Sequence, residues 1–135
     1  GLHPQAIVTF GLLVLELLIR KYRVVVSTHS PIILDLVWAI RQLQGVRQDR
    51  ALPALKRIFG LHQLSPQIKD VLVAALNAEY RVYFFDRTAS GVQARDISTL
   101  DPGDDDEAVA GWGGLSGFSG RIAQIVGEAL PAESA

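Results

Sequence analysis

A short β-branched run that ends in a histidine constrains this chain more than any other feature of its sequence. Val24–Ser27 has the continuous apolar character of a strand that is buried on both faces of a parallel sheet. His29 follows, and Ser30 and Pro31 are typical N-cap and first-turn residues of a helix. The pattern therefore predicts one imidazole at the carboxyl end of a buried strand, where ligands bind in α/β sheets.

Helices are predicted on both sides of this strand. The segment from Pro4 to about Tyr22 has the character of one long helix, and a second helix follows Pro31. The second helix carries its apolar residues at helical spacing: Ile33, Leu34, Val37, Trp38, Ile40 and Leu43. Helix, strand and helix in this order form the middle of a βαβ unit. Because the sequence has no methionine and begins at Gly1, we interpret it as a piece whose preceding strand lies upstream.

The second half of the chain predicts helices and a hairpin. Ala51–Phe59 reads as a short helix that ends at Gly60, and Ser65 and Pro66 begin another. Two strands, 81–87 and 92–97, are predicted to form a hairpin. An acidic loop (101–107) and a glycine-rich loop (111–120) follow, and apolar residues between 118 and 130 mark a closing helix. We therefore predict an α/β fold in three parts: the C-terminal part of a mainly parallel sheet with its helices (1–44), a helical segment (45–78), and a hairpin with an acidic and glycine-rich loop and a closing helix (79–135).

The composition excludes several classes of function. Apolar residues make up 49% and charged residues 20%, so a globular core is expected, and a net charge of -1 gives no electrostatic reason to bind nucleic acid or an anionic membrane. Ala6–Ile19 is apolar but spans only about 14 residues, short of the ~20 that cross a bilayer. The absence of cysteine excludes disulfides and thiolate metal sites, and it fits a cytoplasmic location.

Two histidines are candidates for function. His29 alone is more often a structural residue, but Thr28 and Ser30 flank it with hydroxyls, and an imidazole fixed at a strand end can donate to a phosphate oxygen. His3 leaves two interpretations open, a residue that lines a nucleotide site or a solvent-facing turn residue. We assign no role to His62.

The order of these motifs resembles a known family. The turn Gly1, Leu2, His3 and Pro4, a helix, and then Val24–Pro31 resemble the C-terminal half of an ABC-type AAA ATPase core, as in SMC-like and OLD-like proteins. The resemblance implies that Gly1–Pro4 is the D-loop of a P-loop NTPase. It also implies that Ser27, Thr28, His29 and Ser30 form the switch loop, in which His29 senses the γ-phosphate. The expected partners are the remaining part of the ATPase domain and a second copy, which meet at the nucleotide site, and an effector protein is a further candidate partner.

The departures from the family pattern limit what the chain can do by itself. The sequence contains no G-x-x-x-x-G-K-[ST] phosphate loop, no acidic Walker B strand before Gly1 and no ABC signature, and His3 stands where the D-loop usually has an aspartate. ATP and Mg²⁺ are therefore expected as cofactors of the complete ATPase and not of these residues alone. The alternative from another class is a non-catalytic interaction or regulatory module.

Two further patterns favour structural interpretations. Adjacent carboxylates at 104–107 could suggest a divalent-metal site, but such a run in a Pro/Gly loop is more typical of solvated surface. The glycine-rich segment 111–120 precedes a helix, as phosphate-binding loops do, yet no lysine follows it. We expect this segment to make a tight entry into the closing helix, with Trp112 packed on the hairpin, and we assign no metal site.

Overall fold

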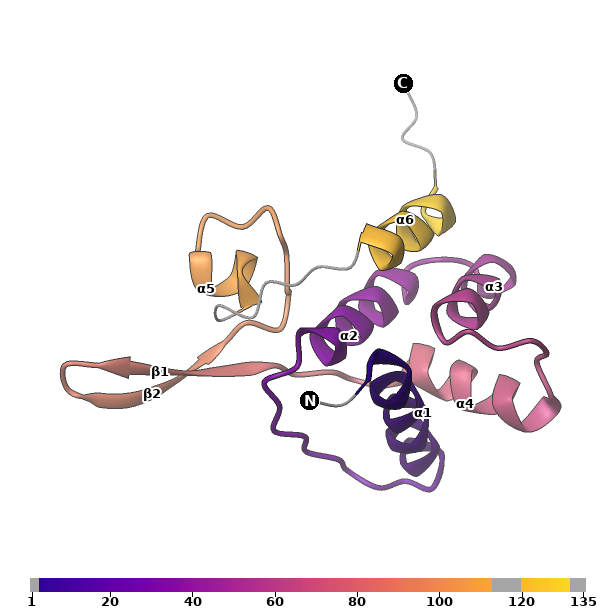
Figure 1. The fold of residues 1–135 in the computed structure, drawn as a ribbon, viewed down its shortest axis with the longest axis horizontal. Coiled ribbons are helices and arrows are strands. Elements are labelled where there is room, and N and C mark those ends of the chain that lie inside the picture. Colours follow the sequence, from indigo (N-terminus) through magenta and orange to yellow (C-terminus); the bar gives the residue numbers. More distant parts are fainter. Residues whose placement is uncertain (1–2, 113–119, 132–135) are drawn as a thin grey trace.

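A computed structural model describes residues 3–112 and 120–131, and in these ranges the fold is α/β, with six helices and a two-stranded antiparallel sheet. The elements are α1 (Pro4–Ile19), α2 (Pro31–Leu43), α3 (Gln48–Ile58), α4 (Pro66–Asn77), β1 (Tyr83–Thr88), β2 (Gly91–Asp96), α5 (Glu107–Ala110) and α6 (Gly120–Ala129). Helices α1 to α4 and α6 form a helical body, and the hairpin of β1 and β2 projects away from it (Figure 1). The larger buried cluster therefore lies between helices, and the hairpin contacts a second, smaller one.

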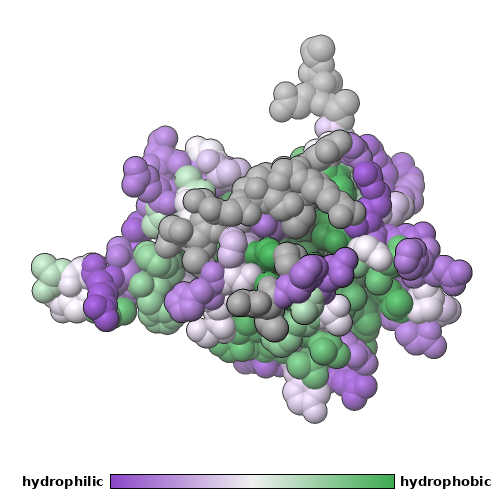
Figure 2. All heavy atoms as spheres, viewed as in Figure 1, coloured by the Kyte–Doolittle hydropathy of each residue, from purple (hydrophilic) through white to green (hydrophobic). Residues whose placement is uncertain are grey.

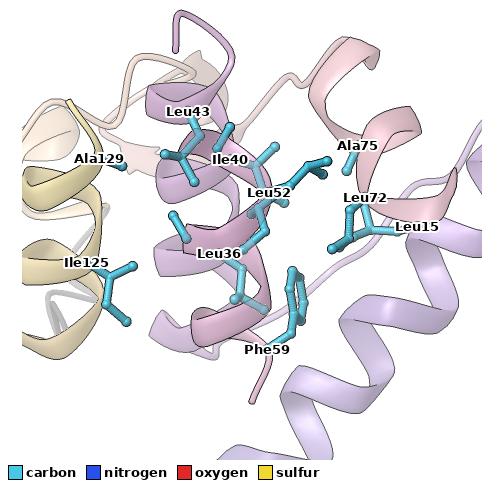
Figure 3. Close-up of a cluster of buried hydrophobic side chains, with 13 residues drawn as sticks. Leu15, Leu36, Ile40, Leu43, Leu52, Phe59, Leu72, Ala75, Ile125 and Ala129 are labelled. Carbon is cyan, nitrogen blue, oxygen red and sulfur yellow. The ribbon is translucent and has the colours of Figure 1, made fainter. Parts of the chain in front are cut away.

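One leucine-rich cluster holds the helical body together. Leu43 of α2, Leu55 of α3 and Leu72 of α4 are fully buried in it, and Figure 3 shows these helices directing their apolar side chains toward one another. The remaining members come from the same helices, from α1 and α6, and from the residue that follows α3, Phe59: Leu15, Leu36, Ile40, Ala51, Leu52, Ala54, Phe59, Ala75, Ile125 and Ala129. Each fully buried leucine contributes about 1.5–3 kcal/mol through removal of its apolar surface from water.

A glycine lets α1 and α2 approach closely. A Cβ at Gly11 would lie 3.2 Å from Cδ1 of Leu36, which is tighter than ordinary van der Waals contact. A larger side chain at this position would require the Leu36 side chain or the helices to shift. Gly11 thus serves the packing of these helices, although glycine disfavours a helix by itself.

The boundaries of α3 and α4 confirm two predictions. Gly60 follows α3 with φ 65°, the N–H of Gly60 donates to the carbonyl of Arg57 (3.2 Å), and the N–H of Leu61 donates to that of Lys56 (2.9 Å). These bonds form a Schellman motif, which requires the left-handed backbone that glycine adopts without strain. At the start of α4, Ser65 Oγ accepts from the N–H of Ile68 at 3.2 Å, as an N-cap residue does.

The predicted hairpin is also confirmed. β1 pairs with β2 in antiparallel register from Tyr83 opposite Asp96 to Thr88 opposite Gly91. At the base of the hairpin, Ile97 is buried in a second cluster that includes Trp112, and the half-buried Phe84 packs on it. The other buried members of this cluster are Leu34, Trp38, Ala39, Leu100, Val109 and Val126. Trp112 therefore anchors the hairpin region, as expected, and its Nε1 donates to the Leu100 carbonyl at 2.9 Å.

The segment after α1 differs from the prediction. Residues 24–27 form no strand, and Val25 is 96% exposed. A parallel strand is stable only beside other strands, and the only strands in the described ranges, β1 and β2, pair with each other. The predicted parallel sheet is therefore absent from the described residues, and Figure 1 shows the segment as a connection that runs from the end of α1 back to the start of α2.

Helix α1 ends three residues before the expected Tyr22. Lys21 adopts a left-handed backbone with φ 67°, and the N–H of Tyr22 donates to the Leu17 carbonyl at 3.1 Å. These features close the helix at Ile19 with the Schellman geometry that glycine usually supplies. The closing helix α6 is present with Ile125 and Val126 buried, as predicted, whereas Phe118 and most of the glycine-rich segment lie outside the described residues.

Candidate functional site

The predicted switch loop lies directly before α2. The Thr28 hydroxyl oxygen accepts the backbone N–H of Ser30 at 2.9 Å and so fixes the turn that leads into the helix. His29 is exposed and forms no hydrogen bond or ion pair with any described residue. Its imidazole is therefore available to a ligand.

The beginning of α2 adds a positive electrostatic end to this loop. Ser30 has the extended backbone of an N-cap residue (φ -85°, ψ 118°), but its side chain makes no capping hydrogen bond. α2 has 13 residues, so its amino end carries the partial positive charge of a helix dipole, which favours anions. His29, two hydroxyls and a helix amino end are consequently adjacent in the chain, and together they suit an oxyanion such as phosphate.

His3 has a structural role at the start of α1. Its Nδ1 accepts the backbone N–H of Gln5 at 3.3 Å, which makes His3 the N-cap of the helix that Pro4 begins. Within the described part of the chain, no hydrogen bond or ion pair joins His3 to residues 27–30. Gly1 and Leu2 of the predicted D-loop lie outside the described residues.

A hydrophobic surface is exposed beside the loop. Phe10, Leu13 and Leu17 of α1 are 45%, 58% and 40% exposed, and their spacing of three and four residues places them on one face of the helix. Figure 2 shows hydrophobic surface in the lower part of the view, over the region where Figure 1 places α1. The backbone of residues 23–29 makes no hydrogen bond to other described backbone groups, so this region exposes both apolar side chains and unpaired polar backbone.

A buried carboxylate lies in the helix that follows His29. Asp35 of α2 is completely buried, and carboxylates are rarely buried in this way unless other groups compensate their charge. No sequence motif points to Asp35. Its signal in the sequence is an acidic residue inside the otherwise apolar run that begins α2.

The acidic loop uses its carboxylates locally. Asp101 Oδ1 accepts the N–H of Gly103 at 2.8 Å, and Asp104 Oδ1 accepts the N–H of Asp106 at 2.8 Å. Asp106 caps α5 and forms an ion pair with Arg95 of β2. Among the residues that the structure describes, no group of three or more His, Asp or Glu side chains is placed to hold a metal ion. Asp101, Asp104 and Asp106 therefore have local structural roles in turns, in the start of α5 and in anchoring the hairpin.

Two surface hollows formed by described residues are not lined by the switch loop, Ser27–Ser30. One, of about 610 Å³, lies between α2 and the start of the hairpin, and Arg41, Tyr80 and Arg81 are among its lining residues. Arg41 donates to the Tyr80 carbonyl at 2.9 Å, while the Tyr80 hydroxyl donates to the Ala75 carbonyl at 2.7 Å. Burial raises the pKa of the Tyr80 phenol, so this hydroxyl stays protonated and structural. The second hollow, of about 920 Å³, lies between the end of α1 and α4.

Comparison with known protein families, curated proteins and solved structures finds no match for this chain. Within the described ranges, no helix has the length and apolar character needed to cross a bilayer. The exposed His29 at the amino end of α2 is therefore the feature on which a functional argument depends.

Proposed function

We propose that this chain contributes the switch-histidine loop to the nucleotide site of an ATP-hydrolysing enzyme of the ABC-type AAA kind. The observation that supports this proposal is an exposed His29 between Thr28 and Ser30, directly before the amino end of a 13-residue helix. An imidazole N–H and a helix amino end are both suited to the charge of a terminal phosphate. Gly1–Pro4 is proposed as the D-loop of the same site, with His3 fixing the start of α1.

The role of His29 in this proposal is to donate a hydrogen bond to a γ-phosphate oxygen and so to position it. The groups that hold Mg²⁺ and the other phosphates, and the glutamate that activates water, belong to motifs that this sequence does not contain. Another segment would have to supply them. The chain alone is accordingly expected to show no measurable ATP hydrolysis and no micromolar affinity for ATP with Mg²⁺ in a calorimetric titration.

The exposed surface near His29 supports the same proposal independently. Val25 is 96% exposed and the backbone around it is unpaired, so a neighbouring strand would both bury the side chain and satisfy the backbone. Covering one valine of this kind contributes about 1.5–3 kcal/mol. The exposed face of α1, which includes Leu13, is also the surface that a helix presents to a sheet in α/β folds.

Replacement of His29 tests the proposal in the complete ATPase. His29→Ala should lower kcat by roughly 10²–10³-fold, the usual effect of removing one hydrogen bond that stabilises transition-state charge. His62→Ala is the matched control, since His62 is also an exposed histidine and lies in the connection between α3 and α4. Because His29 has no described partner, its removal should change the free energy of unfolding by less than about 0.5 kcal/mol. Unchanged turnover in a folded His29→Ala enzyme would remove the switch assignment.

The second candidate is a non-catalytic interaction module, which the projecting hairpin favours. Tyr83, Phe85 and Val92 expose apolar side chains along this hairpin, and exposed apolar groups of this kind are typical of interaction surfaces. The coding sequence upstream of Gly1 separates the two candidates. A phosphate loop and an acidic strand would favour the ATPase, whereas a start codon immediately before Gly1, with neither motif, would favour the module.

A further inference from the structure

The β-hairpin has an open edge whose geometry can be derived from its register. The N–H of Ile97 donates to the Val82 carbonyl at 2.9 Å, and the pairing continues with Phe84 opposite Arg95. Because hydrogen-bonded and non-hydrogen-bonded pairs alternate in an antiparallel ladder, the even-numbered residues of β1 bond to β2. The N–H and C=O groups of Tyr83, Phe85 and Arg87 therefore point away from β2, along an edge that no described strand covers.

The side chains of the same three residues lie on the exposed face of the hairpin. Tyr83 and Phe85 are 54% and 70% exposed, and Arg87 is exposed without an ion-pair partner in the described ranges. The opposite face is held to the body, because Phe84 packs on the second cluster and Arg95 pairs with Asp106. An aromatic face and a free backbone edge thus coincide on one strand, and Figure 1 shows this strand projecting from the helical body.

We infer that β1 is a self-association edge, which pairs in antiparallel fashion with β1 of a second copy about a two-fold axis at Phe85. In this register Phe85 lies opposite Phe85 of the partner subunit, and Tyr83 lies opposite Arg87 of the partner subunit. All three residues direct their N–H and C=O groups toward the new partner, so the backbone hydrogen bonds form without rearrangement. The result is a four-stranded sheet with the aromatic side chains on one face.

Charge and shape favour a second copy as the occupant of this edge. The register at Phe85 stacks the two phenylalanines and places each unpaired Arg87 guanidinium against a Tyr83 ring, a favourable cation–π arrangement. A shift of the axis to Phe84 would instead bring Arg87 opposite Arg81 of the partner subunit, which is repulsive. The edge of β2 is not self-complementary, because an axis at Ala94 would oppose Val92 to Asp96.

The size of the contact sets the expected affinity. Aromatic side chains bury 150–250 Å² each when fully covered, so the exposed portions of Tyr83 and Phe85 offer roughly 250 Å² on each copy. This area is well below the ~800 Å² per partner of a standard interface. The dimer should consequently be weak, with a Kd on the order of 100 μM.

Self-association through β1 goes beyond the proposed ATPase role and does not depend on it, since β1 lies apart from the His29 loop in the sequence.

Sedimentation equilibrium of the 135-residue chain between about 10 μM and 1 mM tests this inference. Wild type should dimerise reversibly, and Phe85→Glu, which opposes two carboxylates at the axis, should weaken dimerisation at least tenfold. Val92→Glu is the matched control, because Val92 has a similar exposure of 64% on the same face but lies on β2. It should change the Kd by less than about threefold. A wild type that stays monomeric at 1 mM, or equal effects of the two variants, would overturn the inference.

A disulfide test uses the absence of natural cysteine. Hydrogen-bonded antiparallel pairs have Cα atoms about 5.5 Å apart, within the range that a disulfide spans. Phe85→Cys should therefore form a covalent dimer under mild oxidation, whereas Val92→Cys should form it at least tenfold more slowly. Circular dichroism that matches wild type shows that each variant folds. Equal rates of cross-linking in two folded variants would contradict pairing at Phe85.

Discussion

Replacing Lys21 by glycine should stabilise the chain, although it removes a charged side chain. Lys21 lies just after α1 with φ 67°, and its N–H donates to the Leu18 carbonyl at 3.0 Å. A non-glycine residue in this left-handed conformation costs about 1–2 kcal/mol, while glycine loses about 0.5–1 kcal/mol more backbone entropy on folding. Because the Lys21 side chain is exposed and forms no described ion pair, Lys21→Gly should raise the free energy of unfolding by about 0.5–1 kcal/mol.

Urea unfolding followed by circular dichroism measures this change directly. A gain of 1 kcal/mol also corresponds to a rise of roughly 3–5 °C in Tm for a chain of this size. Lys21→Ala is the control that removes the charge but keeps a Cβ, and it should show no comparable gain. Gly60→Ala, at φ 65° after α3, should have the opposite effect and lose about 1 kcal/mol. The reasoning is refuted if Lys21→Gly is no more stable than Lys21→Ala.

Two further predictions concern the core and the base of the hairpin. Leu55→Ala should lower the free energy of unfolding by about 3–5 kcal/mol because Leu55 is fully buried, whereas Leu13→Ala, at 58% exposure, should cost less than about 1 kcal/mol; urea unfolding compares them. Hydrogen bonds from Ser98 lower the pKa of the Asp96 carboxyl, so its stabilising contribution is present above the ordinary pKa of 3.8 and is lost as the pH falls through the lower folded value. The stability difference between wild type and Asp96→Asn should therefore shrink below about pH 3.8, and a difference that is independent of pH would count against this assignment.

The predictions that the structure confirms depend on local chemistry. The Ser65 cap is settled by a hydrogen bond to Ile68 three residues away, and the Gly60 stop by bonds within one helical turn. The hairpin pairs strands separated by two turn residues, with Thr88 opposite Gly91. In each case the residues that determine the structure are neighbours in the sequence, so the sequence pattern contains the information that is needed.

The strand expected over Val24–Ser27 shows where such reasoning fails. A β-branched apolar run favours an extended backbone, but a strand forms only when another strand pairs with that backbone. No sequence neighbour supplies that pairing, and the segment stays outside any sheet with Val25 exposed. Two other features could not be predicted from residue type. Left-handed Lys21 carries none of the usual glycine signal, and Asp35 occupies a buried position that its residue type does not predict.

The helical core packs without the two exposed segments, Val24–Ser27 and β1. Leu43, Leu55 and Leu72 close a core to which Val25 and Phe85 contribute nothing, so covering these exposed residues is not needed for the helices to pack. Exposed apolar side chains are costly to leave in water, and an open strand edge can pair with another strand, which supports the two proposals that Val24–Ser27 and β1 each take part in assembly. Under the proposed function, a strand that pairs with Val24–Ser27 would also fix the Thr28 turn and hence the direction of the His29 imidazole. Phosphate sensing would then depend on assembly of the sheet, and His29 would act only in the complete site.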